Sequence, residues 1–258
     1  PPATWSNPNW TWDSALSAAR KLTTRTSDGI VTQWGFSQYY WLSVQLHWGA
    51  DYVDDALQNF TGLDERVLDS WQAMQDLTWR YEVQPRPGAQ GAANAALHAY
   101  ASYSLQRMVE SEQRLAYASW FRVGHNPPVG TMIPMGLSLL RSAPNKENGW
   151  ELLKFATLDP EGNLLWNMAA GSVPGMLQVH PRWLTTMEEY RPYNIHTFID
   201  LVTKYPAIEK IRRLTGLNQI IGLLDGAWNS VMSNEKSPRQ ALTEIADAAN
   251  EIIRKGQQ

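Results

Sequence analysis

The sequence predicts a helix-rich α/β fold with a few short strands. Most apolar residues recur three and four positions apart, which is the spacing along one face of an amphipathic helix. Runs typical of strands are short and few, and stretches rich in Gly, Pro, Ser and Asn separate the segments. At 258 residues, the chain is long enough for one large domain or for two smaller ones that each have a core.

The N-terminal part supplies clear local signals. A helix is predicted to begin near Thr11, because the side chain of Thr11 or Asp13 can accept hydrogen bonds from the free N–H groups of a first turn. After a Ser-Asp-Gly turn, a strand is predicted over residues 30–36, in which Gly35 allows another backbone to approach closely.

The same periodicity predicts helices along the rest of the chain. The last helix is well defined, because Ser237 can cap its first turn and Pro238 occupies its first position. Two more short strands are expected over residues 120–124 and 135–140. The helices are expected over residues 39–46, 64–81, 92–114, 145–157, 162–170, 182–190, 195–203, 206–213, 217–233 and 237–255.

Composition excludes several function classes. A net charge of −3 argues against a nucleic-acid partner, which would require a basic patch. The absence of Cys excludes disulfides, zinc–thiolate sites and cysteine nucleophiles. No apolar run approaches the roughly 20 residues of a transmembrane helix. Because the chain starts at Pro1 rather than Met, we expect a processed or truncated product.

Tryptophan is unusually frequent, at 13 residues against 5 Phe. A buried indole needs a partner for its N–H, so Phe would fill a core more easily. Flat rings with a donor at the edge suit sugars, whose C–H faces stack while their hydroxyl groups form hydrogen bonds. Burial remains the alternative for each single ring. On that basis, the rings on expected inward helix faces are assigned to packing: Trp12, Trp71, Trp150 and Trp166.

Enzyme chemistry is not expected. The sequence contains no HExxH motif, no GxSxG motif and no phosphate-binding P-loop, so neither a metal nor a cofactor is predicted. The five His residues are isolated from one another: His47, His98, His125, His180 and His196. A glycoside hydrolase needs two carboxylates about 5 to 9.5 Å apart. Sequence cannot place such a pair, so a sugar-processing hydrolase stays open as an alternative, as does a non-catalytic helical interaction domain.

Several stretches, in matching order and spacing, resemble the extracellular solute-binding proteins (family 1 type) of carbohydrate ABC importers. Residue 50 is Ala where the family has Gly, and residues 90–119 lack a legible counterpart of a usual family motif. The stretches that carry the resemblance are TWDSAL continuing to ARKLT (residues 11–23), QWGF (33–36), YYW with WGAD (39–51), SAPNKENGWELLKF (142–155), GSVP (171–174) and SPRQAL continuing to NEII (237–253).

The resemblance implies a two-lobe, periplasmic-binding-protein-like fold with most of the N-terminal lobe absent from the chain. Residues 1–133 would form the second lobe, 134–192 would return through the first lobe, and 193–258 would be closing helices on the second. The implied function is a receptor that captures a carbohydrate and, by lobe closure, delivers it to an ABC permease. It would act in the periplasm or outside the cell, with tethering to the membrane through a missing N-terminal segment as a further option.

Position in this implied fold selects the candidate ligand-binding residues. Tyr39 and Trp41 follow the strand at residues 30–36, and ligands of open α/β sheets bind at strand ends. An interior position for Trp41 and a plain tight loop at residues 171–172 are the alternatives. The candidates for stacking are Tyr39, Trp41, Trp48 and Trp120, and the candidate hydrogen-bond donors are Gly171 and Ser172.

Overall fold

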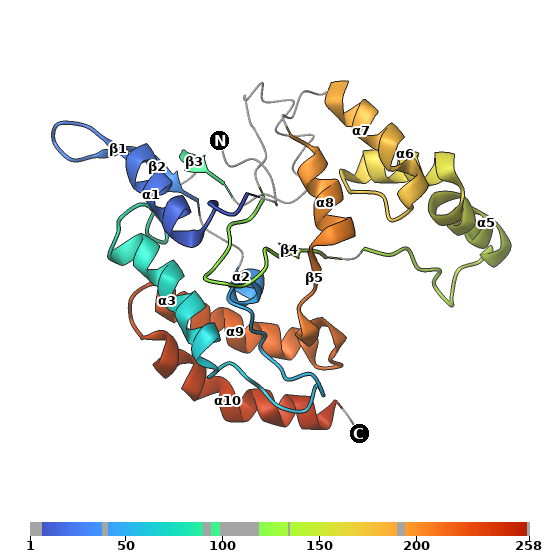
Figure 1. Cartoon of the computed structure of the whole chain (residues 1–258). Helices are drawn as coiled ribbons and strands as arrows, with labels where there is room; N and C mark the ends of the chain where they lie inside the picture. The colour runs from blue at the N-terminus through green and yellow to red at the C-terminus, as the bar shows by residue number, and fades with distance from the viewer. Residues whose placement is uncertain are drawn as a thin grey trace. The chain divides into compact units, whose positions relative to one another are not determined.

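The computed structural model has the helix-rich α/β architecture that the sequence predicts (Figure 1). It describes residues 7–37, 41–89, 94–98, 119–133, 135–189 and 194–256. The chain divides into two compact units. Unit 1 contains Met132–Pro206, and unit 2 contains Pro8–Ala99, Phe121–Thr131 and Ala207–Gln258. The finer division at residues 133 and 192 stays a prediction.

Unit 2 begins with α1 (Trp12–Leu22), whose N-terminus is capped as predicted. The Ser14 N–H donates to the Thr11 hydroxyl oxygen at 3.3 Å, and the Thr11 N–H donates to Ser14 Oγ at 2.8 Å. These reciprocal bonds form a capping box, which satisfies two N–H groups that a helix start leaves without partners.

A three-stranded sheet lies beside α1. Its central strand β2 (Val31–Phe36) pairs antiparallel with β1 (Thr24–Arg25) and parallel with β3 (Ala95–Leu97). The close approach predicted at Gly35 is confirmed, because a Cβ placed on Gly35 would lie 1.9 Å from the carbonyl oxygen of Ala19. The absence of a side chain thus lets α1 pack directly on the backbone of β2.

Three long helices enclose the core of unit 2. The helix α3 (Glu65–Trp79) packs against α9 (Leu217–Met232) and α10 (Pro238–Lys255), which also pack on each other (Figure 1). Trp71 of α3 is fully buried at their centre. Its ring lies edge-on to Trp228, with 5.0 Å between ring centroids, and its Nε1 donates to the Tyr52 hydroxyl at 2.8 Å. The packing role expected for Trp71 is confirmed.

The buried carboxylate of Glu209 connects the segment after residue 206 to the rest of unit 2. Glu209 has no exposed surface, accepts a hydrogen bond from the Ser43 hydroxyl, and pairs with Arg212 Nε at 2.5 Å. The Lys210 N–H donates to the Asp51 carboxylate at 2.9 Å. Since a buried charge is tolerated only when paired and hydrogen-bonded, these contacts fix the position of the segment after residue 206.

Unit 1 is mostly helical, and its core is small. Leu164, Trp183, Met187 and Ile195 form this core, with Trp183 fully buried. Its helices α5 and α6 pack side by side (Figure 1). The elements are α5 (Lys146–Leu158), α6 (Pro160–Ala170), the 3₁₀ helix η3 (Leu177–Val179), α7 (His180–Glu189) and α8 (His196–Lys204).

Four secondary-structure predictions are wrong within the described residues. Residues 120–124 form a single bridge to Thr11 rather than a strand, and residues 135–140 form no strand. Residues 95–97, inside the expected helix 92–114, are strand β3, because pairing with β2 outweighs the helical preference of alanine. The expected helix 206–213 is instead β5 (Pro206–Ala207), paired with β4 (Gly130–Thr131), followed by the 3₁₀ helix η4 (Lys210–Arg213).

Two burial assignments also fail. Trp150 and Trp166 were expected on inward faces, but they are 55% and 47% exposed. Helical periodicity identifies an apolar stripe, yet it does not say whether anything covers that stripe.

Candidate functional site

Four aromatic rings come together in unit 2, and we call them the indole cluster: Trp12, His47, Trp48 and Phe121. The Trp12 centroid lies 5.4 Å from that of Trp48 and 5.1 Å from that of Phe121, at interplanar angles of 64° and 59°. His47 and Phe121 are 6.0 Å apart. Such tilted and edge-on arrangements are favourable for aromatic pairs, so the cluster holds its rings in defined orientations.

Backbone contacts fix the positions of these rings. The Trp12 N–H donates to the Arg122 carbonyl at 2.8 Å, and the Arg122 N–H donates to the Trp10 carbonyl at 2.9 Å. These two bonds join the start of α1 to the segment that carries Phe121. Trp48 ends the short helix α2 (Val44–His47), where its N–H donates to a carbonyl of that helix.

Exposure distinguishes the members of the cluster. Phe121 and His47 are each 2% exposed and Trp48 is 9% exposed, whereas Trp12 is half-buried. Trp12 is therefore the one ring of these four with substantial surface available for a ligand. Trp48 and Phe121 pack against it and restrict its rotation, and His47 packs against Phe121.

Burial has an electrostatic consequence at His47. Removal of the imidazole from water lowers the pKa of His47 well below its usual value of 6.5, because burial disfavours the charged form. His47 is therefore neutral at physiological pH, and the cluster carries no positive charge from this ring.

We expect the stability of unit 2 to fall on mild acidification. Below pH 6.5 the unfolded chain protonates His47 while the folded chain does not, so folding stability is present above that pH and is lost as the pH falls. For this one group, the free energy of unfolding should drop by roughly 1 kcal/mol between pH 7 and 5.5. Urea unfolding of wild type and His47→Leu at both pH values measures this loss. The variant should show a flatter pH dependence than the wild type. A flat wild-type profile would contradict the burial of neutral His47.

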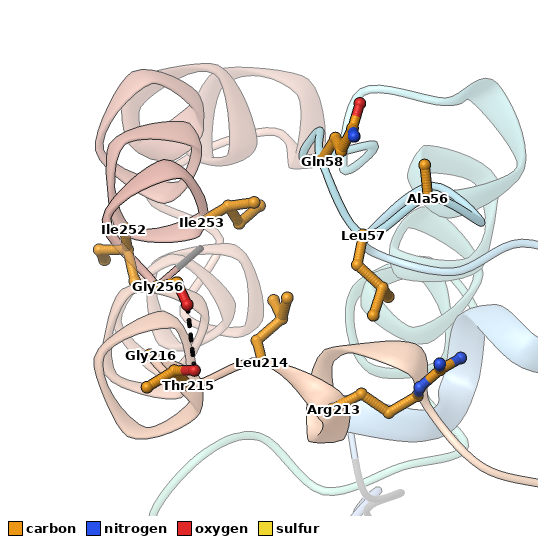
Figure 2. Close-up of a pocket in the computed structure, with 10 residues that line it drawn as sticks. All are labelled: Ala56, Leu57, Gln58, Arg213, Leu214, Thr215, Gly216, Ile252, Ile253 and Gly256. Atoms are coloured by element: carbon orange, nitrogen blue, oxygen red, sulfur yellow. Dashed lines mark hydrogen bonds between the residues drawn. The ribbon is translucent and has the colours of Figure 1, made fainter. Parts of the chain in front are cut away.

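A separate hollow of about 290 Å³ also lies in unit 2 (Figure 2). Its wall is partly polar, with Thr215 Oγ1 donating to the Gly256 carbonyl at 3.2 Å. It contains no aromatic ring and no member of the indole cluster, so it lacks the stacking surface expected for a sugar. The lining residues are Ala56, Leu57, Gln58, Arg213, Leu214, Thr215, Gly216, Ile252, Ile253 and Gly256.

Neither a metal-binding cluster nor a membrane-spanning helix is found in the part of the chain that the structure describes. Within it, no group of three or more His, Asp or Glu side chains is placed to hold a metal ion. No described helix combines the length and apolarity needed to cross a bilayer.

Comparison by sequence finds no relative, since neither a protein-family model nor a curated protein matches the chain. Comparison of structures does. An ABC substrate-binding protein of Listeria monocytogenes in complex with cycloalternan superposes with a TM-score of 0.74 and 14% identity, over 95% of this chain and 64% of that one. The chain has the fold of the ABC solute-binding proteins.

Two further structures agree with this fold. The maltose/maltodextrin-binding domain MalE of Bdellovibrio bacteriovorus, bound to maltotriose, gives a TM-score of 0.71 and 16% identity, over 97% of this chain and 67% of that one. A solute-binding protein of Thermotoga lettingae, bound with α-D-tagatose, gives a TM-score of 0.72 and 17% identity, over 96% of this chain and 65% of that one. The chain thus spans about two thirds of the length of these solute-binding proteins, which agrees with the fold predicted from the sequence.

The aromatic candidates fall in different places within this fold. Tyr39 lies outside the described residues, and Trp41 is described only by its backbone, as the first residue of the 3₁₀ helix η1 (Trp41–Ser43). Trp48 belongs to the indole cluster but is almost fully buried. Trp120 is half-buried and precedes Phe121, although it is assigned to unit 1. None of these positions tests a role in binding, so those roles stay predictions.

The loop after α6 engages its backbone N–H groups locally. Gly171, with a φ of 64°, ends the helix, and its N–H donates to carbonyls of the last turn. The Ser172 N–H donates to the Asn167 carbonyl at 2.9 Å. This arrangement favours the tight-loop alternative for both backbone groups. The Ser172 hydroxyl is buried, without a hydrogen-bond partner among the described residues, and stays a candidate donor.

The sequence assigns Trp12 to packing; the structure packs it on Trp48 and Phe121 and also leaves part of its ring accessible, which adds it to the candidate residues. Trp10 and Trp12 flank Thr11, whose backbone is extended. The residues on either side of an extended residue lie on the same face, so the sequence pattern does not separate the two rings. Trp10 is 9% exposed, which leaves Trp12 as the ring with an accessible surface.

Proposed function

We propose that this chain is the sugar-capturing part of a receptor that serves a carbohydrate ABC importer. The observation that carries the proposal is the match of 95–97% of the chain to solute-binding proteins solved with bound sugars. The excess of indoles and the partly exposed ring of Trp12 support it from the sequence and the site.

The indole cluster suits binding of a sugar without chemical change to it. A sugar ring stacks its C–H face on an indole, and a ring held by its neighbours loses little rotational freedom on binding. Trp12 would supply this surface, while Trp48 and Phe121 hold its orientation. Stacking of the sugar on Trp12 and orientation of that ring by its neighbours require neither a nucleophile nor a general acid, so the proposed role is non-catalytic.

The finer parts of the proposal concern the whole transport system. A bound sugar that stabilises the closed state of the two lobes would present that state to the permease, which would then receive the sugar. A location in the periplasm or outside the cell follows from that partner. Delivery and location are properties of a whole receptor, and this chain spans about two thirds of the length of the solute-binding proteins compared.

Replacement of Trp12 tests the proposal. We expect maltotriose or tagatose to bind the chain saturably in isothermal titration calorimetry, without turnover. Trp12→Ala should weaken binding at least tenfold, which is about 1.4 kcal/mol. Trp12→Phe, which keeps a ring, should weaken it less. Trp150→Ala removes an exposed indole of unit 1 and should leave the affinity unchanged.

The contrary outcomes are distinct. Turnover of aryl glycosides would replace the receptor by a glycoside hydrolase. Equal sugar affinities for the wild type and a folded Trp12→Ala variant would show that the indole cluster is not part of the binding site. A panel of sugars and polyols in which none saturates the chain would favour a non-catalytic interaction domain.

A further inference from the structure

Arginine side chains gather around two aromatic rings on the surface of unit 2. They come from the end of α1, from β1, from the residue that ends α3 and from the segment after it. All four arginines are exposed. Because they lie some sixty residues apart in the sequence, only the fold brings them together. We call this group the arginine patch: Arg20, Arg25, Arg80 and Arg86, with Trp79 and Tyr81.

The aromatic rings hold three of the guanidinium groups. Those of Arg20 and Arg80 lie over the ring of Tyr81, at 4.4 Å and 5.2 Å from its centroid. That of Arg86 lies 4.5 Å from the centroid of Trp79, whose Nε1 donates to a carbonyl of α9 at 2.8 Å. A guanidinium that stacks on a ring through its face presents the N–H groups at its edge to other partners.

One carboxylate orders the other side of the patch. Glu82 is shared, with its Oε2 at 3.4 Å from Arg25 Nη2 and its Oε1 at 3.8 Å from Arg86 Nη2. Arg25 Nη2 also donates to the Glu82 carbonyl at 3.2 Å. Glu82 has a φ of 50°, which is uncommon for a residue other than glycine. The carboxylate thus orients two arginines but supplies the charge of one.

Positive charge exceeds negative charge in the patch. The second carboxylate that pairs with these arginines is Asp76, at 3.3 Å from Arg80 Nη1. Arg20 forms no ion pair with a described residue. Four arginines against the two carboxylates of Asp76 and Glu82 leave an excess of two positive charges, in a chain whose net charge is −3. Like charges held close together repel, so a negative charge from outside is favoured here.

The chemistry of the patch favours an acidic protein partner. Arg, Trp and Tyr are the residues that contribute most to affinity at protein–protein interfaces. A guanidinium fork binds a carboxylate through two parallel hydrogen bonds, and a fork already held on a ring loses little freedom on binding. An anionic membrane suits the patch less. Arg25 Nη1 donates to the Gly29 carbonyl at 3.3 Å, and this exposed turn carries the carboxylate of Asp28, which such a membrane would repel.

We propose that the arginine patch is a docking surface for an acidic segment of a partner protein. Carboxylates of that segment bind the edges of the guanidinium groups of Arg20 and Arg86, which Tyr81 and Trp79 hold in place. No residue of the indole cluster takes part. The inference therefore does not depend on whether the chain binds a sugar.

A glutamate octapeptide, capped at both ends, is the acidic probe for the test. It is titrated into the isotope-labelled 258-residue chain, and NMR spectra follow the backbone amides. We expect saturable shifts at residues 20–25 and 79–86. An increase of NaCl from about 50 to 500 mM should weaken binding at least about tenfold, because salt screens exposed charges.

Substitutions separate the patch from general charge effects. Arg20→Gln and Arg86→Gln should each weaken binding of the octapeptide at least about threefold. Arg86→Lys should weaken it at least about twofold, because lysine keeps the charge but loses the planar fork. Arg213→Gln removes an exposed arginine of unit 2 outside the patch, so it should change the affinity less than about twofold. Circular dichroism of each variant checks that the helices are intact.

Four results would overturn the proposal. One is the absence of saturable shifts at residues 20–25 and 79–86. Another is an equal loss of affinity for Arg213→Gln and Arg20→Gln, which would indicate a general effect of charge. The third is binding to phosphatidylglycerol vesicles, lost in Arg20→Gln, without binding to the octapeptide, since a membrane would then be the partner. The fourth is tighter binding of a thymidine oligonucleotide than of the octapeptide.

Discussion

Replacement of Trp71 by alanine is expected to lower the free energy of unfolding of unit 2 by about 3–5 kcal/mol. Trp71 is fully buried, lies edge-on to Trp228, and donates a hydrogen bond to the Tyr52 hydroxyl. The substitution removes the apolar contacts of the indole and opens a cavity among α3, α9 and α10, which can close only in part. This loss is a large share of the roughly 5–15 kcal/mol that stabilises a typical protein.

Urea unfolding followed by circular dichroism measures this loss, and hydrogen exchange at the α9 amides assigns it to unit 2. Trp71→Phe keeps a ring but loses the N–H donor, so it should cost less, about 1–2 kcal/mol. Trp150→Ala is the matched control, because a side chain that is 55% exposed should change stability by no more than about 0.5 kcal/mol. Equal losses for Trp71→Ala and Trp150→Ala would contradict the central position of Trp71.

The sequence predicts the capped helices well. Thr11, Asn145 and Ser237 precede helices that begin one residue later, and each side chain accepts from an N–H of the first turn. Capping and amphipathic spacing are local properties, so a window of about ten residues contains most of what decides them. The fold class followed from these elements and from the resemblance.

The strands are harder to predict, because pairing is a long-range property. Residues 95–97 become strand β3 only because β2, some sixty residues earlier, offers a free edge. Residues 135–140 have the composition of a strand but no partner in the described chain. The same cause explains the exposure of Trp150 and Trp166, whose helices have an apolar face that nothing described here covers.

The candidate site was predicted in kind rather than in detail. The excess of Trp over Phe indicated aromatic stacking, and the structure does gather indoles with Phe121 in unit 2. The sequence pointed to Trp48, whereas Trp12 has the more accessible ring. Exposure depends on what packs over each ring, and a helix-start position such as that of Trp12 looks structural from the sequence alone.

The second large effect is expected at Gly35, where one added methyl group should lower the free energy of unfolding by about 3 kcal/mol or more. A Cβ at this position would lie 1.9 Å from the oxygen and 2.5 Å from the carbonyl carbon of Ala19. Both atoms belong to the backbone of α1, so no side chain can rotate away, and the helix itself must move off β2. Because α1 carries Trp12 at its start, this movement should also weaken sugar binding.

A matched substitution separates this clash from the general effect of replacing glycine. Gly226 lies inside α9, and a Cβ there would meet no atom within 4 Å. Gly226→Ala should therefore raise the free energy of unfolding by about 0.5–1 kcal/mol, because alanine loses less conformational entropy in a helix. The same added methyl group should thus stabilise at Gly226 and destabilise at Gly35 in urea unfolding. If Gly35→Ala were as stable as wild type, α1 could not pack on β2 at the distance found here.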